Sequence, residues 1–132
     1  MELRISYDFA DLDKARVVDA IQTSYWGGNR TADQILRSFE NSSCAGLFQD
    51  GVQLGFVRAF SDKVFSTYIN DLFVHDEFRG NGHAHRLLDA LFDHPELSEI
   101  KHWMLATKDA HSLYEKHGFE MVAEGHFMGM TR

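Results

Sequence analysis

The sequence predicts a single α/β domain over residues 1–132, with a central mixed sheet and helices packed on it. The length is close to the usual size of one domain, and the shares of apolar (44%) and charged (25%) residues are typical of globular proteins. Segments with the alternation of strands are interspersed with segments of helical periodicity. A strand–helix–strand succession from Tyr68 to Ala106 requires parallel or mixed pairing. The expected order of elements is β-α-α-β-β-β-α-β-α-β-β.

The first third of the chain is expected to form one strand and two helices. Residues 2–7 alternate apolar and polar side chains, which is typical of a strand. Residues 11–24 have helical spacing, with two aspartates near the positive end of the helix dipole. The apolar positions at that spacing are Val17, Val18, Ile21 and Tyr25. After a loop over residues 26–30, Thr31 and Gln34 form the pattern of a capping box, which predicts a second helix.

The middle of the chain is rich in aromatic and β-branched residues. Strands are expected over residues 44–49, 52–60 and 65–75. The first two flank Asp50-Gly51, a pair that favours the tight turn of a hairpin. These two strands are therefore predicted to pair with each other.

The last third alternates helices and short strands. One helix follows Gly82 and ends before His94, and another over residues 110–117 is stopped by Gly118, which suits the position after a helix C-terminus. Strands are expected over residues 102–106, 120–123 and 126–130. The chain is thus predicted to end in two short strands.

Acidic residues outnumber basic ones by twenty to thirteen, which gives a formal net charge of −7. A generic nucleic-acid-binding protein is more often basic, so no nucleic-acid partner is expected. The same acidity means that an anionic ligand needs a local positive patch to overcome the field of the whole chain.

The sequence also indicates a compartment. Cys44 is the only cysteine, so no disulfide can form within the chain, which fits a reducing cytoplasm. The N-terminal residues carry charges throughout, and no apolar run approaches the ~20 residues of a membrane helix. A soluble, cytoplasmic protein without a membrane partner is expected. No metal site is expected either, because His83 and His85 are two apart on a helix and point in different directions.

The most informative segment runs from Asp71 to Arg86. An apolar strand ends there, a short acidic turn follows, and Arg79-Gly80-Asn81-Gly82 opens an amphipathic helix. Backbone N–H groups at a helix N-terminus have no intrahelical partner, and together with the helix dipole they form an anion site. The two glycines let phosphate oxygens approach the backbone closely. The segment therefore supplies a local positive patch that suits a pyrophosphate.

Two common nucleotide motifs are absent from this segment. No third glycine completes a Gly-x-Gly-x-x-Gly pattern after Gly82, and no Gly-Lys-Ser/Thr of a Walker loop occurs. A nucleotide-binding domain is therefore poorly supported. An ordinary strand-to-helix turn without a ligand remains an open alternative for Gly80–Gly82.

Two motifs resemble those of the GNAT family of N-acetyltransferases. Arg79-x-x-Gly82-x-Ala84 is similar to the Arg/Gln-x-x-Gly-x-Gly/Ala loop with which the family holds the pyrophosphate of acetyl-CoA. The segment Ala-His-Ser-Leu-Tyr-Glu-Lys-His-Gly-Phe, residues 110–119, looks like the family's Ala-x-x-Leu-Tyr-Glu-Lys-x-Gly-Phe helix. The motifs occur in the family's order with a strand between them. The resemblance implies the GNAT fold, a twisted mixed sheet with helices on both faces.

The resemblance implies a role for each matching residue. The main chain of Leu72-Phe73-Val74 would pair with the pantetheine arm, and amides from Gly80 to Ala84 would hold the pyrophosphate. The strand over 102–106 would splay away from its neighbour, and a backbone N–H near Val74 would polarise the thioester carbonyl. Tyr114 would protonate the leaving thiolate, because a phenol with a pKa near ~10 stays protonated at neutral pH. The residues implied for the coenzyme are Leu72, Phe73, Val74, Arg79, Gly80, Asn81, Gly82, His83, Ala84, Thr107, Ala110 and Tyr114.

Some roles have structural alternatives, and two positions depart from the family's pattern. Tyr114 could also be a core residue of an amphipathic helix. Family members often carry a basic Glu on the strand before the loop, whereas Asp71 is the only acid there in this chain. Asp71 is predicted to accept the amine proton, directly or through a water, with a structural carboxylate as the equal alternative. Where the family often has Asn, this chain has Thr107, whose hydroxyl has a shorter reach.

The resemblance places the acceptor between the first two helices and the central hairpin. Trp26, Arg30 and Asn41 are the predicted acceptor-site residues, with ordinary loop or surface positions as the alternative for each. Phe48 and Arg58 of the hairpin could also face this site, with the same alternative. The acidic chain attracts a cationic amine, whereas Arg30 could clamp a substrate carboxylate.

The predicted function is transfer of the acetyl group of acetyl-CoA to an amine of a small-molecule acceptor. The neutral amine would attack the thioester directly. The alternative, prompted by the missing Glu, is a module that binds acyl-CoA and has lost acetyl transfer. The family often dimerises, so a homodimer is a further expectation.

Overall fold

The computed structural model describes residues 2–132, and Met1 of the predicted domain lies outside them. The strands are β1 (Leu3–Ser6), β2 (Ser43–Gln49), β3 (Val52–Ser61), β4 (Ser66–Val74) and β5 (His102–Met104). The α-helices are α1 (Lys14–Thr23), α2 (Ala32–Glu40), α3 (His83–Phe92) and α4 (His111–Glu115). Two 3-10 turns, η1 (Phe9–Asp11) and η2 (Asp76–Phe78), precede α1 and α3. Within residues 2–132, no helix combines the length and the apolar character that crossing a membrane requires.

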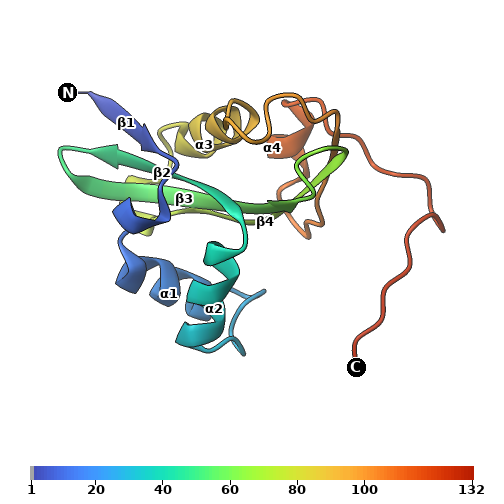
Figure 1. Cartoon of the computed structure of the whole chain (residues 1–132), viewed down its shortest axis with the longest axis horizontal. Helices are drawn as coiled ribbons and strands as arrows, with labels where there is room; N and C mark the ends of the chain where they lie inside the picture. Colours follow the sequence, from blue (N-terminus) through green and yellow to red (C-terminus); the bar gives the residue numbers. More distant parts are fainter. Residues whose placement is uncertain (1) are drawn as a thin grey trace.

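The strands form one mixed sheet in the order β1-β2-β3-β4-β5 (Figure 1). Neighbouring strands are antiparallel except β4 and β5, which run parallel. The parallel pair is connected through α3, because two parallel neighbours need a crossover rather than a hairpin. The predicted mixed sheet is confirmed.

Helices cover both faces of the sheet, with α1 and α2 on one side and α3 and α4 on the other (Figure 1). Each face has its own core. Leu87 of α3 packs in the cluster that contains Val57, and Phe39 of α2 packs in the cluster that contains Phe56. Val57 and Phe56 are adjacent on β3, where successive side chains point to opposite faces. One strand therefore anchors both helical layers.

Two local sequence signals take the predicted form. Asp50 and Gly51 have φ values of 53° and 79°, and positive φ at both central residues is the mark of a type I′ hairpin turn. The Thr31 hydroxyl accepts from the Gln34 N–H at 3.1 Å, and the Gln34 side chain accepts from the Thr31 N–H at 2.9 Å. The predicted hairpin and capping box are confirmed.

The parallel strands β4 and β5 stay together only at one end. Their pairing is confined to Ser66–Tyr68 and His102–Met104. No described strand pairs with that edge of β4 from Ile69 to Val74. Backbone groups along this edge are therefore available to another extended chain or ligand.

The two strands predicted over residues 120–123 and 126–130 are wrong. Residues 120–132, which we call the arm, follow α4 without pairing to any described strand, and all of them are exposed. The alternating apolar pattern reports a preference for extended backbone, but a strand also needs a neighbour. The order of elements therefore ends at α4.

The first helix also differs from its prediction. It begins at Lys14, because the Asp13 carboxylate caps it by accepting from the Arg16 N–H at 3.2 Å. Tyr25, predicted on its apolar face, lies beyond its end and is 62% exposed. Helical spacing alone cannot show that the chain has already left the helix.

Candidate active site

A cleft of about 840 Å³ opens at the C-terminal end of β4, where β5 has diverged. Its walls are β4, the loop before α3, the start of α4 and the chain after α1. We call it the β4 cleft. The predicted coenzyme residues that line it are Leu72, Phe73, Val74, Arg79, Gly80, Gly82, His83, Ala84, Ala110 and Tyr114. Residues far apart in the sequence thus meet at one cavity.

The loop before α3 leaves open space above its backbone. Gly80 has a φ of 85°, and Gly82, the N-cap of α3, has a φ of 77°. A Cβ placed on Gly80 would meet no atom within 4 Å, and one on Gly82 would meet only the Arg86 guanidinium at 3.5 Å. The N–H groups in the first turn of α3 have no intrahelical partner. The loop can therefore present backbone donors to an anion in a conformation that glycine adopts readily.

Polar side chains hold this loop in shape. Arg79 Nε donates to the Val74 carbonyl at 3.0 Å, and its guanidinium pairs with Asp76 at 3.0 Å. Arg86 donates to the Asn81 carbonyl at 2.5 Å. The Asn81 amide itself donates to two backbone oxygens of the loop at 3.2 and 3.3 Å. Asn81 is thus turned toward the loop backbone and does not line the cleft.

Two titratable side chains of the cleft have shifted proton affinities. Burial, with a smaller contribution from Tyr25, raises the pKa of Tyr114 to about 12. Burial and the neighbouring Arg86 lower the pKa of His83, so its ring is neutral at pH 7. The cleft therefore holds a phenol that keeps its proton, beside a loop whose positive charge comes from arginine.

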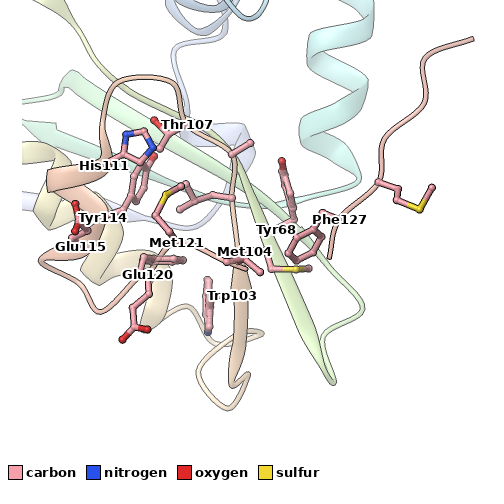
Figure 2. A pocket seen from close by; sticks show the side chains of 15 residues that line it. Tyr68, Trp103, Met104, Thr107, His111, Tyr114, Glu115, Glu120, Met121 and Phe127 are labelled. Carbon is pink, nitrogen blue, oxygen red and sulfur yellow. The ribbon is translucent and has the colours of Figure 1, made fainter. Parts of the chain in front are cut away.

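Tyr114 also borders a second cavity of about 550 Å³, which we call the tail cavity. It lies between the end of β5, α4 and the arm (Figure 2). Figure 2 shows Tyr68 and Phe127 on one side of it and His111 with Tyr114 on the other. The lining is largely apolar and includes Trp103 and Met104 of β5. Tyr114 is the predicted site residue common to both cavities.

Thr107 lies in the tail cavity and not in the β4 cleft. Its hydroxyl accepts a hydrogen bond from the Ala110 N–H at 3.1 Å, just before α4 begins. The short side chain thus stabilises the entry to α4, whereas its contact with a coenzyme stays a prediction.

Asp71 is fully buried on β4 and is surrounded by donors. One carboxylate oxygen accepts from Trp26 Nε1 at 2.8 Å and from Arg30 Nη1 at 3.2 Å. The other accepts from Arg58 Nε at 2.8 Å. Charge-assisted bonds of this kind compensate the burial of a carboxylate. Both carboxylate oxygens are hydrogen-bonded, and the residue has no exposed surface. This environment favours a structural role for Asp71 over the role of a proton acceptor.

The three predicted acceptor-site residues do not form one group. Trp26 lines the β4 cleft, with its ring centroid 6.5 Å from that of Phe73, and Arg30 is one-third exposed beside Asp71. Asn41 lies at the end of α2 and donates to the Arg37 carbonyl at 2.9 Å. The structure brings Trp26 and Arg30 together through Asp71, whereas the Asn41 side chain closes its own helix.

Sequence reasoning placed Arg58 on the acceptor side, but it missed the pairing of Arg58 with Asp71 and the place of Tyr25 in the cleft. Arg58 is 7% exposed, and it binds Asp71, Asn70 and the Ser42 hydroxyl. The signal for it was a single arginine inside an apolar strand, since a buried guanidinium needs an anionic partner. Tyr25 lines the β4 cleft. Its position continues the apolar spacing of the preceding helix, so the spacing did not indicate that Tyr25 lies beyond that helix.

Metal binding has no support in the described part of the chain. Across residues 2–132, no three His, Cys, Asp or Glu side chains are grouped as metal ligands would be. His85 and His117 do contact each other at 2.8 Å, so this pair belongs to the packing of α3 against the segment after α4.

Comparison with known proteins places these features in context. Residues 40–121 match the family model described as an acetyltransferase (GNAT) domain. None of the curated proteins compared matches the chain. A crystal structure from Xanthomonas campestris pv. campestris, assigned to the GNAT acetyltransferases, is 31% identical with a TM-score of 0.93. The alignment covers 100% of this chain and 94% of that one.

More distant structures share the fold. One assigned as an acetyltransferase from Deinococcus radiodurans is 20% identical with a TM-score of 0.77, over 98% of this chain and 88% of that one. Glucosamine-6-phosphate N-acetyltransferase from Arabidopsis thaliana is 17% identical with a TM-score of 0.70, over 100% and 98% of the two chains. At these identities the likeness concerns the fold alone.

Proposed function

The chain belongs to the GNAT family of acetyltransferases, and from this premise we propose that it transfers the acetyl group of acetyl-CoA to an amine of a small-molecule acceptor. The observation that carries the proposal is the β4 cleft, where a free strand edge, a glycine loop and a protonated phenol meet. We further propose that residues 1–132 act as one domain and work in the cytoplasm.

The residues present fit acetyl-CoA. The open space above Gly80 and Gly82 suits the pyrophosphate, and the unpaired edge of β4 through Val74 suits the amide-bearing pantetheine arm. Bound there, acetyl-CoA supplies an acetyl group activated as a thioester. The half-buried Leu72 and Phe73 exclude water from the neighbouring end of the cleft.

Tyr114 is the proposed acid. Because its pKa lies at about 12, it holds its proton at neutral pH and can give it to the sulfur of the departing thiolate. The bond between the amine nitrogen and the acetyl carbon forms as the carbon–sulfur bond breaks, and the amine proton leaves to water. A backbone N–H near Val74 is proposed to polarise the thioester carbonyl.

Asp71 is proposed as a positioning residue in this reaction. Its contacts hold Trp26 at the cleft and keep Arg30 beside it, so the carboxylate orients the wall on which an acceptor would rest. Uptake of the amine proton by Asp71 remains the competing prediction. The net charge of −7 steers a cationic amine toward the molecule.

A thiol-release assay tests the proposal. The purified chain is incubated with acetyl-CoA and a panel of amines, and free thiol and product mass are measured. We expect thiol release that depends on the amine and a product that is heavier by one acetyl group. Absence of amine-dependent release, with acetyl-CoA still bound, would overturn transfer in favour of an acyl-CoA-binding module.

A further inference from the structure

Arg30 is fixed in place by its backbone. Its N–H donates to the Gly27 carbonyl at 3.0 Å, and its own carbonyl accepts from the Gln22 side chain at 3.1 Å. The capping box of α2 begins at the next residue, Thr31. The side chain therefore extends from an ordered point of the loop after α1, and a ligand that binds it does not have to order this backbone first.

The guanidinium of Arg30 has donors that no protein group uses. Nη1 is the nitrogen that reaches Asp71, at 3.2 Å from one carboxylate oxygen and 3.4 Å from the other. Within residues 2–132, its Nε and Nη2 form no hydrogen bond, and the side chain is 33% exposed. A guanidinium holds its N–H donors in a planar fork. One side of this fork is therefore open to an acceptor from solution.

Arg30 belongs to a cluster with more positive than negative charge. The buried carboxylate of Asp71 is shared by the guanidiniums of Arg30 and Arg58, so one positive charge is left over. The remaining contacts of Arg58 are with the neutral oxygens of Ser42 and Asn70. Among residues 2–132, no other acidic side chain forms an ion pair with either arginine. In a chain with a net charge of −7, this is a local positive site that is exposed at Arg30.

The cluster adjoins the β4 cleft through Trp26. The indole N–H of Trp26 donates to the same Asp71 oxygen that Arg30 contacts, so the indole and the guanidinium are neighbours. Trp26 is 37% exposed and lines the cleft together with Leu72 and Phe73 of β4. A molecule bound at Arg30 can therefore extend along an aromatic surface into the cleft.

A ligand that carries only positive charge finds no partner in this cluster. Asp71 has no exposed surface, and both of its oxygens are occupied by protein donors. An ammonium group from solution therefore has no access to this carboxylate. The exposed charge of the cluster is that of Arg30, which repels a cation and attracts an anion.

Building on the proposed function, we propose that the acceptor is an amine that also carries a carboxylate, as an amino acid does, and that Arg30 binds this carboxylate through Nε and Nη2. Two parallel N–H groups of a guanidinium match the two oxygens of a carboxylate. Trp26 then lies beside the carbon skeleton of the acceptor, and the amine points toward the β4 cleft. Asp71 orients the guanidinium without neutralising the cluster.

Paired acceptors test the proposal by kinetics. Each amino acid of a panel is compared with the amine that lacks its carboxylate, for example phenylalanine with phenylethylamine. We expect the native chain to prefer the amino acid by about 10–100-fold in kcat/KM, the usual effect of a hydrogen-bonded charge. Arg30→Gln should lose this preference through a higher KM for the amino acid, with the KM for acetyl-CoA unchanged. Arg30→Lys, which keeps the charge but not the fork, should recover part of it.

The matched control is Arg37→Gln. Arg37 lies on α2 with its side chain 67% exposed, and it pairs with Asp33 at 3.0 Å. Its removal takes one positive charge from the same region and should leave the preference for the amino acid intact. Circular dichroism checks that each variant is folded.

Binding of the reaction products gives a readout without turnover. N-acetyl amino acids and their uncharged amides are titrated by calorimetry in the presence of coenzyme A. We expect an acid to bind the native chain and Arg37→Gln, and to bind Arg30→Gln about 10–100-fold more weakly, whereas its amide binds all three proteins alike. No binding of any acid, equal binding of acid and amide, or equal affinity of an acid for the native chain and Arg30→Gln would each overturn the proposal.

The two proposals fail in different ways. Acetylation of amines without regard to a carboxylate would overturn the role of Arg30 and leave the proposed function standing. Carboxylate binding that depends on Arg30, without transfer to any amine, would support the site at Arg30 and overturn acetyl transfer.

Discussion

Asp71 illustrates how one buried residue can tie several elements together. Its carboxylate joins Trp26 and Arg30 from the loop after α1 to Arg58 of β3, while the residue itself lies on β4. A buried charge is tolerated because its partners replace the hydration that it loses. The same arrangement makes removal of the carboxylate costly, since Arg58 would remain buried without its anion.

We therefore expect Asp71→Asn to lower the free energy of unfolding by about 3–5 kcal/mol, the range for breaking a buried pair from one side. Urea denaturation measures it. The control is Glu77→Gln, which breaks the exposed pair with Arg16 and should shift the urea midpoint far less. Equally small shifts of the urea midpoint for both variants would contradict a stabilising role of the Asp71 carboxylate.

Tyr114 is the proposed acid, so the proposed transfer of a proton to the thiolate depends on it. We expect Tyr114→Phe to lower kcat by about 10²–10⁴-fold, the usual contribution of a general acid, while affinity for acetyl-CoA is kept. Because the pKa of Tyr114 is about 12, ionisation of this phenol should not reduce turnover at pH values below about 10.

Steady-state kinetics and calorimetry check this expectation. Tyr68→Phe, which removes a hydroxyl from the tail cavity only, should keep its turnover. If Tyr114→Phe also turned over at the native rate, Tyr114 would have no acid role.

At the scale of elements, the capping box of α2 sets where the loop after α1 ends. The box fixes the first turn of α2 directly after Arg30. We expect Thr31→Ala to lower the free energy of unfolding by about 1 kcal/mol, because an N–H in the first turn loses its acceptor. Urea denaturation measures this, with Thr23→Ala in the last turn of α1 as control. An unchanged midpoint for Thr31→Ala would contradict the role of the cap.

Elements with local signals could be predicted, and elements that depend on distant partners could not. The β2–β3 hairpin and the capping box follow from neighbouring residues, so the sequence alone predicted both. Residues 126–130 carry the alternation of a strand but have no neighbour within the described chain. Likewise, the partners of Asp71 come from two segments, the loop after α1 and β3, and no spacing rule links either of them to β4.

At the scale of the whole molecule, stability should depend on acid pH through buried histidine. His75 is 3% exposed and contacts Gln53 at 3.0 Å, and burial, with a smaller effect from Arg16, lowers its pKa. The folded state then binds a proton less readily than the unfolded state, so protonation favours unfolding. We expect the free energy of unfolding to fall as the pH drops below about 6.5.

Urea titrations between neutral and mildly acidic pH test this dependence. His75→Asn, which keeps a hydrogen-bonding side chain, should flatten it, and His126→Asn in the exposed arm should not. A pH profile that is the same in native chain and His75→Asn would exclude His75 as the cause.

The β4 cleft is also a property of the whole molecule. Its glycine loop was predictable, because Arg79, Gly82 and Ala84 lie within six residues of one another. The part of its wall at Tyr25 could not be predicted, because the position of Tyr25 depends on where α1 ends. The position of Thr107 in the tail cavity could not be predicted either, because it depends on the path of β5. Short motifs thus predict the chemistry of a site, whereas tertiary packing decides which side chains face it.

The most direct measurement of the central claim is a calorimetric titration with acetyl-CoA. The native chain, Gly82→Trp and Gly51→Trp are compared, since Gly51 has the same positive φ, at 79°, but lies in the β2–β3 turn. Both substitutions place a side chain on a backbone with positive φ, and only Gly82→Trp fills the space above the loop before α3. We predict one site per chain in the native protein and in Gly51→Trp, and loss of binding in Gly82→Trp. Equal affinity for all three proteins would contradict the assignment of the β4 cleft to acetyl-CoA.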